Sequence, residues 1–226
     1  MNIDEIIRNK TEILEKLRSK DRKEREEAWE KVKFLVDTGN GNLLQSDLGY
    51  LRSLLWHKLQ GVRDDAWNHL DIYKELLVSG IGRALIAQSD RIKWSAWSKV
   101  LDLIRLGIVS KDYVIENRNS YWRLLKSRWV TIRKKAWRLF VTLVKEGIFQ
   151  PKDKERFKDF LRHRKASVRI YAWESVPKLI QLGFLTVDEV KAEISYLEDL
   201  LKIESKVKKR ALKVLKDLKL QGEAHQ

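Results

Sequence analysis

The sequence predicts an all-α protein, an α-solenoid of about six stacked helical hairpins. Composition is the first observation behind this prediction, because a chain of 226 residues with two prolines, ten glycines and 35% charged side chains favours helices almost throughout. The second is an internal repeat: the pair Ala-Trp occurs five times, at intervals of 30 to 40 residues. Repeats of this length are typical of supersecondary units that stack and share a core.

The repeat has a fixed pattern around each central residue. The six copies are centred on Trp29, Trp67, Trp97, Trp137, Trp173 and Leu212. Lys or Arg stands four residues before the centre in every copy, an apolar residue stands three after it, and glycine stands ten after it in five copies. At 100° per residue the apolar positions share one arc of a helix, so we expect these tryptophans to be core residues rather than a ladder for stacking bases.

Each copy is predicted to be a hairpin of two helices, in a single domain spanning residues 1–226. The glycine ten residues after the centre predicts a left-handed helix end. After a helix over 3–17, the first helices of the hairpins are expected near 46–57, 81–87, 111–125, 151–161 and 187–200. The second helices, which carry the centres, are expected near 21–38, 61–79, 90–106, 129–146, 166–182 and 205–220, followed by a frayed tail at 223–226.

The start of the second helix resembles the HEAT-repeat family, the α-solenoids related to armadillo repeats. The resemblance lies in segments such as Val62-Arg63-Asp64-Asp65-Ala66 and Val168-Arg169-Ile170-Tyr171-Ala172. It implies a right-handed solenoid whose second helices line the concave face. The chain departs from the family in lacking the turn Asp six residues before the basic residue in all six copies, where it has Ser19, His57, Ala87, Ser127, His163 and Lys202. We expect the basic row either to pack between repeats or to meet an external anion.

The net charge of +15 is concentrated in one region. Residues 1–117 and 170–226 each carry a net charge of +1, whereas residues 118–169 hold 17 basic and four acidic residues. There is no acid between Asn117 and Lys145. A local field of this kind attracts polyanions, although a solvated surface is the alternative.

The outward positions of the second helices are the predicted partner-binding residues. They are Lys134, Lys135 and Arg138 in the fourth copy and Lys209, Arg210 and Lys213 in the sixth, joined by Arg162, Arg164 and Lys165 from the turn of the fifth. Trp94 lies out of phase with the core and is predicted either to anchor a partner or to cover a repeat junction. Trp122 and Trp129 lie in the basic region, where they either pack in the core or stack on bases.

No catalytic signature is present, and we expect no catalytic residues, no cofactor and no metal. The chain has no cysteine, no HExxH pair and no phosphate loop. The leading interpretation is a non-enzymatic scaffold that binds an acidic macromolecule, with a protein preferred as the partner. The alternative is a module that binds DNA or RNA, with or without the base excision of a repair glycosylase. Docking on an anionic membrane is a third interpretation.

The sequence also predicts the cellular location of the protein. The acidic start Met1-Asn2-Ile3-Asp4-Glu5 lacks the bases of a signal peptide, and no apolar stretch reaches the roughly 18 residues that span a bilayer. We therefore expect a soluble, cytoplasmic monomer without integral membrane association. The single methionine, the absence of cysteine and the high charge hint at a thermophile.

Overall fold

The computed structural model describes residues 1–224, and every regular element in that range is a helix. The prediction of an all-α chain is therefore confirmed. The contacts divide the chain into two units, Met1–Asn117 and Arg118–Gln226, and each unit is described by itself. The boundary between the units coincides with the start of the basic region, so the second unit carries 27 basic and 13 acidic residues.

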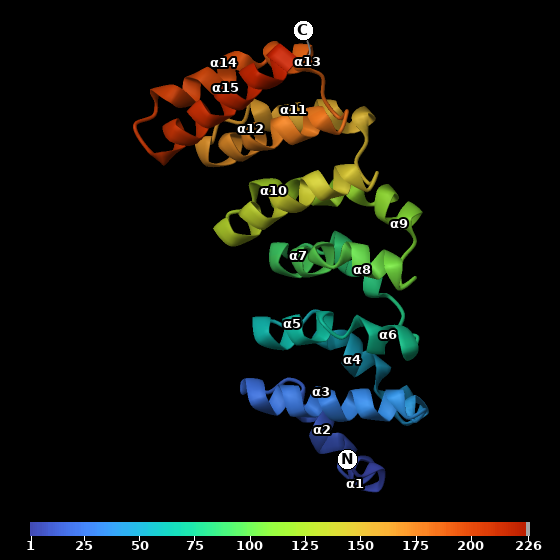
Figure 1. Cartoon of the computed structure of the whole chain (residues 1–226). Coiled ribbons are helices and arrows are strands. Elements are labelled where there is room, and N and C mark those ends of the chain that lie inside the picture. Colours follow the sequence, from blue (N-terminus) through green and yellow to red (C-terminus); the bar gives the residue numbers. More distant parts are fainter. Residues whose placement is uncertain (225–226) are drawn as a thin grey trace. The chain divides into compact units, whose positions relative to one another are not determined.

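The first unit contains three second helices that contact one another in chain order (Figure 1). They are α3 (Arg22–Asp37), the pair α5 (Gln60–Trp67) and α6 (Leu70–Glu75), and the pair α7 (Asp90–Ser98) and α8 (Val100–Arg105). The helices that precede or follow them are α1 (Ile3–Arg8), α2 (Lys10–Lys16), η1 (Gly41–Asp47), α4 (Leu48–Leu54), η2 (Ile81–Ile86) and α9 (Lys111–Glu116), where η marks a 3₁₀-helix.

The second unit repeats the hairpin, and each of its second helices is a single undivided helix. These are α10 (Val130–Lys145), α12 (Ala166–Gln181) and α15 (Lys206–Ala224), and α12 contacts both of the others. Their partners are η3 (Arg118–Lys126), η4 (Pro151–Asp153), α11 (Lys154–Leu161), α13 (Val187–Lys191), α14 (Ile194–Glu198) and η5 (Asp199–Lys202). The predicted tail therefore belongs to α15 as far as Ala224, and its last two positions lie outside the described residues.

The five central tryptophans are buried, which confirms that they are core residues. Each indole belongs to the interior of its own hairpin, because in four copies Nε1 donates a hydrogen bond to the carbonyl oxygen of the residue twelve positions earlier. The four acceptors are Leu55, Leu85, Leu125 and Leu161. The sixth copy differs, since Ala211 is buried but Leu212 is 50% exposed.

The basic row packs between helices, which supports the structural role that we considered for it. In four copies the arginine donates a hydrogen bond to the carbonyl oxygen six residues earlier, as Arg63 does to His57 at 2.8 Å and Arg133 does to Ser127 at 2.9 Å. The other two pairs are Arg25 with Ser19 and Arg169 with His163. A backbone carbonyl therefore takes the place of the missing turn carboxylate as the acceptor.

The side chain that stands in place of the missing turn Asp also forms a hydrogen bond within the turn. Ser19 Oγ, His57 Nδ1, Ser127 Oγ and His163 Nδ1 each accept a hydrogen bond from the backbone N–H two residues later, at 3.0 to 3.2 Å. Such side chain to backbone bonds stabilise turns in the way that aspartate does. Serine and histidine therefore perform the local task of the absent Asp.

Glycines end the second helices in the left-handed conformation, as the spacing predicts. Gly39, Gly107, Gly147 and Gly183 have φ between 73° and 79°. In the second copy the corresponding position is Leu77, which adopts φ 57°. Gly222 does not end a helix, because α15 continues to Ala224, so the expected stop there is wrong.

Two of the second helices that were expected to be continuous are interrupted. The ring of His69 bonds to the carbonyl oxygen of Asp65 at 2.6 Å, and the His69 N–H turns instead to Ala66. Ser98 Oγ likewise takes the carbonyl of Ser95, and the N–H of Lys99 turns to Ala96. Side-chain competition for the helical acceptor therefore divides the helices predicted over 61–79 and 90–106.

Candidate functional site: a basic groove between α10 and α12

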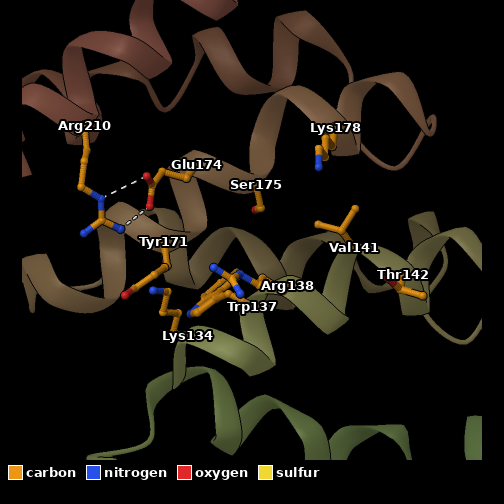
Figure 2. A pocket seen from close by; sticks show the side chains of 10 residues that line it. All are labelled: Lys134, Trp137, Arg138, Val141, Thr142, Tyr171, Glu174, Ser175, Lys178 and Arg210. Carbon is orange, nitrogen blue, oxygen red and sulfur yellow. Dashed lines mark hydrogen bonds and ion pairs between the residues drawn. The ribbon is translucent and has the colours of Figure 1, made fainter. Parts of the chain in front are cut away.

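The second unit contains a groove of about 540 Å³ between α10 and α12, closed at one end by Arg210 of α15 (Figure 2). Its ten lining residues come from one face of each helix. They are Lys134, Trp137, Arg138, Val141 and Thr142 of α10, Tyr171, Glu174, Ser175 and Lys178 of α12, and Arg210. The groove has the size of an ordinary ligand or peptide site.

The side of the groove formed by α10 carries two cations. Lys134 and Arg138 are one helical turn apart and therefore share a face, and both are exposed. No acid lies within 117–145 of the sequence, and no ion pair of either side chain occurs within the described part of the chain. Lys178 adds a third exposed cation from α12. These three cations are available to an anionic ligand.

Glu174 is the only acid among the lining residues, and it is already engaged. Its carboxylate accepts two hydrogen bonds from the guanidinium of Arg210, one of them 3.0 Å long from Nε. The bond to Glu174 raises the pKa of Arg210. The same guanidinium lies 4.7 Å from the centre of the Tyr171 ring. Arg210 is therefore held by Glu174 and Tyr171, and the ion pair forms one end of the groove.

The floor of the groove is largely apolar. Trp137 is buried, and its Nε1 bonds to Leu125, so only its carbon atoms are offered to a ligand. Val141 is half-buried beside it. Ser175 is buried and donates its hydroxyl hydrogen to the carbonyl of Ala172 at 2.6 Å. The groove thus presents cations at its rim and hydrocarbon below them.

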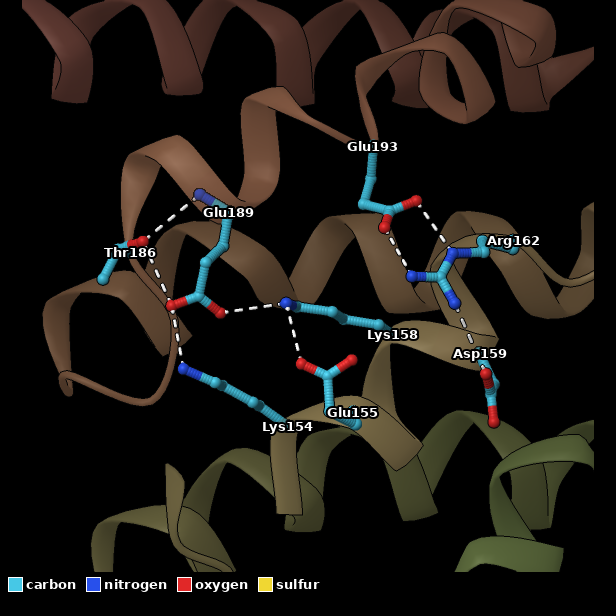
Figure 3. Close-up of polar contacts among 8 residues, drawn as sticks. All are labelled: Lys154, Glu155, Lys158, Asp159, Arg162, Thr186, Glu189 and Glu193. Carbon is cyan, nitrogen blue, oxygen red and sulfur yellow. Dashed lines mark hydrogen bonds and ion pairs between the residues drawn. The ribbon is translucent and has the colours of Figure 1, made fainter. Parts of the chain in front are cut away.

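Several cations of the first helices, in contrast, form ion pairs within the second unit (Figure 3). Lys154 and Lys158 both bind the carboxylate of Glu189 at 3.1 Å. Burial raises the pKa of Glu189, but the hydrogen bonds from the two lysines outweigh that effect and hold it below its usual value. Arg162 bonds to Glu193 with 2.5 Å and 2.9 Å contacts, and Arg118 pairs with the buried Asp153 at 2.8 Å. These four cations are therefore less available to an external anion than Lys134, Arg138 and Lys178.

The structure brings together three of the predicted site residues, Lys134, Arg138 and Arg210, and shows where the others lie. Lys135, Lys209 and Lys213 are exposed but do not line the groove. Arg164 and Lys165 are exposed in the turn between α11 and α12, next to the ion-paired Arg162. Trp94 is half-buried on α7 in the first unit. Trp122 is buried, whereas Trp129 is 39% exposed.

Sequence reasoning missed Lys178, Val141 and Thr142. The outward positions considered were three and two before the centre and one after it, whereas these residues stand four or five after it. These positions lie one helical turn further along the same face as the outward positions, so the repeat pattern could have predicted that they line the groove.

Neither metal chemistry nor a membrane span is evident in the described residues. Within 1–224 no three His, Asp or Glu side chains are grouped so as to hold a metal ion. None of the described helices has the length and apolar character needed to cross a bilayer. No family model matches the chain, and no curated protein matches it in sequence.

Proposed function

We propose that this chain is a HEAT-like helical-repeat protein that binds an acidic segment of a protein partner in the groove between α10 and α12. The repeat supports the architectural half of this proposal, since the same tryptophan and arginine contacts recur from hairpin to hairpin. Right-handed solenoids of stacked hairpins are built in this way. The role requires no catalysis by the chain itself.

The observation that carries the binding half is the set of three exposed cations around an apolar floor. Lys134, Arg138 and Lys178 attract carboxylates, and the hydrocarbon of Trp137 and Val141 accepts an apolar side chain. An acidic peptide with an intervening apolar residue fits both features.

The dimensions favour a short stretch of extended peptide. Lys134 and Thr142 are eight residues apart on α10, which is about 12 Å at the helical rise. An extended chain covers that length in about four residues. Glu174 at one end disfavours a continuous line of phosphates, which makes a protein segment the better match than a nucleic acid for this groove.

Charge reversal in the groove tests the proposal. We would titrate a short fluorescein-labelled glutamate-rich peptide containing one leucine and follow its anisotropy. The variant Lys134→Glu/Arg138→Glu/Lys178→Glu should bind on the order of tenfold or more weakly than the wild type. The matched control is Lys152→Glu/Lys191→Glu/Lys216→Glu, which changes the net charge equally at exposed positions of the same unit.

The control separates a site from general attraction. Wild-type affinity in the control variant supports the groove as the binding site. Equal losses in the two variants, or unchanged binding in the groove variant, would contradict it. Circular dichroism melting of all three proteins verifies that each is folded.

A further inference from the structure

A second exposed basic surface lies outside the groove, in the turns that lead into α10 and α12. It consists of Lys126, Arg128 and Trp129 from the first turn and Arg164 and Lys165 from the second, and we call it the turn surface. All five side chains are exposed. Trp129 is 39% exposed, and the guanidinium of Arg128 lies 4.9 Å from the centre of its ring.

The two turns lie next to each other. α10 packs against α12. Besides burial, the positive charge of Lys126, before α10, lowers the pKa of His163, before α12. Burial is the main cause that lowers the pKa of His163, and Lys126, Lys165 and Arg164 lower it further. The cations of the turn surface therefore form one continuous field rather than two separate clusters.

Two of the three corresponding turns of the first unit end in a capping side chain, whereas the turn before α5 ends in Leu59, which does not cap. The start of α3 is capped by Asp21, which accepts from the N–H of Lys23 at 2.9 Å, and the start of α7 is capped by Ser89. The equivalent positions before α10 and α12 are Trp129 and Lys165, whose side chains do not cap. Neither helix has an acid in its first turn. At the turn surface an indole and a lysine therefore stand where α3 and α7 have a capping side chain.

We propose that the turn surface binds single-stranded nucleic acid, with Trp129 stacking on a base and Lys126, Arg128, Arg164 and Lys165 contacting phosphates. This site is separate from the groove and does not depend on the function proposed for it. An exposed indole beside cations is the combination that single strands use, because their bases are free to stack. A duplex keeps its bases inside, and would leave the indole without a partner.

The spacing of the two turns also favours a nucleic-acid strand over a single phosphate ion as the ligand. Packed helices are about 8–10 Å apart, so the two turns present their cations at separate points along a ligand. A flexible phosphodiester chain can contact both turns, whereas a single phosphate cannot. Residues 118–145 contain no acid, and near the second turn the carboxylates of Asp159 and Glu193 are paired with Arg162.

Anisotropy of fluorescein-labelled oligothymidylate and oligouridylate of about twelve nucleotides tests the site in the full chain. With four phosphate-contacting side chains, the logarithm of the affinity should fall with the logarithm of the salt concentration with a slope of roughly −3. Trp129→Ala should weaken binding on the order of tenfold, whereas Trp129→Phe should retain most of it because the stacking ring remains.

A second variant excludes unfolding as the cause of a loss. Trp129→Ser/Lys165→Asp introduces the capping residues that the first unit uses at Ser89 and Asp21, so the helix starts should be as stable or more stable. The expected result is weaker oligonucleotide binding with an equal or higher melting temperature. The charge-matched control is Lys152→Glu, which changes the net charge by the same two units at an exposed position. It keeps the turn surface intact and should bind more tightly than the turn variant.

Four outcomes would overturn the proposal. The first is the absence of oligonucleotide binding at low salt, and the second is a preference for a duplex of the same length. The third is the same loss in the control as in the turn variant. The fourth is binding to vesicles of phosphatidylcholine and phosphatidylserine that Trp129→Ala abolishes while oligonucleotide binding is unaffected, which would assign the surface to a membrane. The acidic-peptide titration uses another probe and other residues, so the two proposals fail independently.

Discussion

The indole Nε1 of Trp67 donates a hydrogen bond of 2.9 Å to the backbone carbonyl oxygen of Leu55, twelve residues earlier. The bond joins the second helix of a hairpin to the end of its own first helix, and three other copies repeat it. Trp29 occupies the same position in the first copy, but its buried Nε1 has no hydrogen-bond partner among the described residues. Its ring instead stacks on His69, with centroids 4.4 Å apart.

This difference predicts unequal costs for the same substitution. Trp67→Phe removes apolar area and leaves the buried carbonyl of Leu55 without its donor, whereas Trp29→Phe removes apolar area together with an unsatisfied N–H. An orphaned buried polar group costs about 1–3 kcal/mol. We expect Trp67→Phe to lower the free energy of unfolding by at least about 1 kcal/mol more than Trp29→Phe does. Denaturant unfolding followed by circular dichroism measures both, and equal losses would contradict the assigned role of the hydrogen bond.

Leu77 predicts a stabilising substitution. It has φ 57° and is 78% exposed, at the position where four other copies use a left-handed glycine. A non-glycine residue in that conformation costs about 1–2 kcal/mol, and little burial is lost with the side chain. Leu77→Gly should therefore raise the free energy of unfolding by about 1 kcal/mol. Gly39→Ala is the reverse control, since nothing lies within 4 Å of an added Cβ and only the φ of 79° opposes it.

Two histidines predict that stability falls on acidification. Burial, followed by neighbouring cations, lowers the pKa of both His57 and His163, so the fold favours their neutral forms. Their contribution is complete above the unfolded pKa of about 6.5 and is lost as the pH falls through and below that value, because the unfolded chain then binds more protons. Each Nδ1 would also lose its role as an acceptor on protonation.

The repeat supplies the variant that tests this pH dependence. His57→Ser/His163→Ser copies Ser127, whose hydroxyl accepts from the N–H of Trp129 at 3.2 Å. The double variant should keep its stability near pH 7.5 and lose less of it than the wild type between about pH 7 and pH 5. Thermal melts across that interval provide the comparison, and parallel curves for the two proteins would show that these histidines are not responsible.

Glu174 predicts a gain of binding in the groove. Glu174→Gln breaks the ion pair with Arg210 and removes the only acid of the lining, which leaves the guanidinium to an incoming carboxylate. The affinity for the acidic peptide should increase by about threefold to tenfold. Glu146→Gln makes the same change in net charge at an exposed position that does not line the groove and should have a smaller effect. A decrease in affinity on Glu174→Gln would contradict the groove as the binding site.

The sequence was most informative where a rule recurs in every copy. The burial of Trp29, Trp67, Trp97, Trp137 and Trp173 follows from their common phase, and the left-handed glycines follow from their spacing. The breaks at His69 and Lys99 do not follow from the pattern, because each depends on one side chain that takes a helical acceptor. Competition between one side chain and the backbone for a carbonyl oxygen does not recur at a fixed spacing, so the repeat pattern cannot predict it.

The candidate site was only partly predictable for a related reason. Charge counting located the basic region, and helical phase located Lys134 and Arg138 on its exposed face. Which cations are already paired depends on contacts between residues about 30 positions apart, such as Arg162 with Glu193 and Lys154 with Glu189. Linear sequence shows the charges but not these neutralising partners.

The bond from each tryptophan to the carbonyl twelve residues earlier also bears on how the chain reaches its native state. Every such contact closes a short loop inside one hairpin, so its formation does not wait for distant segments to meet. Proteins dominated by contacts of this local kind have low contact order and fold rapidly. A nascent chain could therefore complete one hairpin after another during synthesis, with each finished hairpin serving as a template for the next.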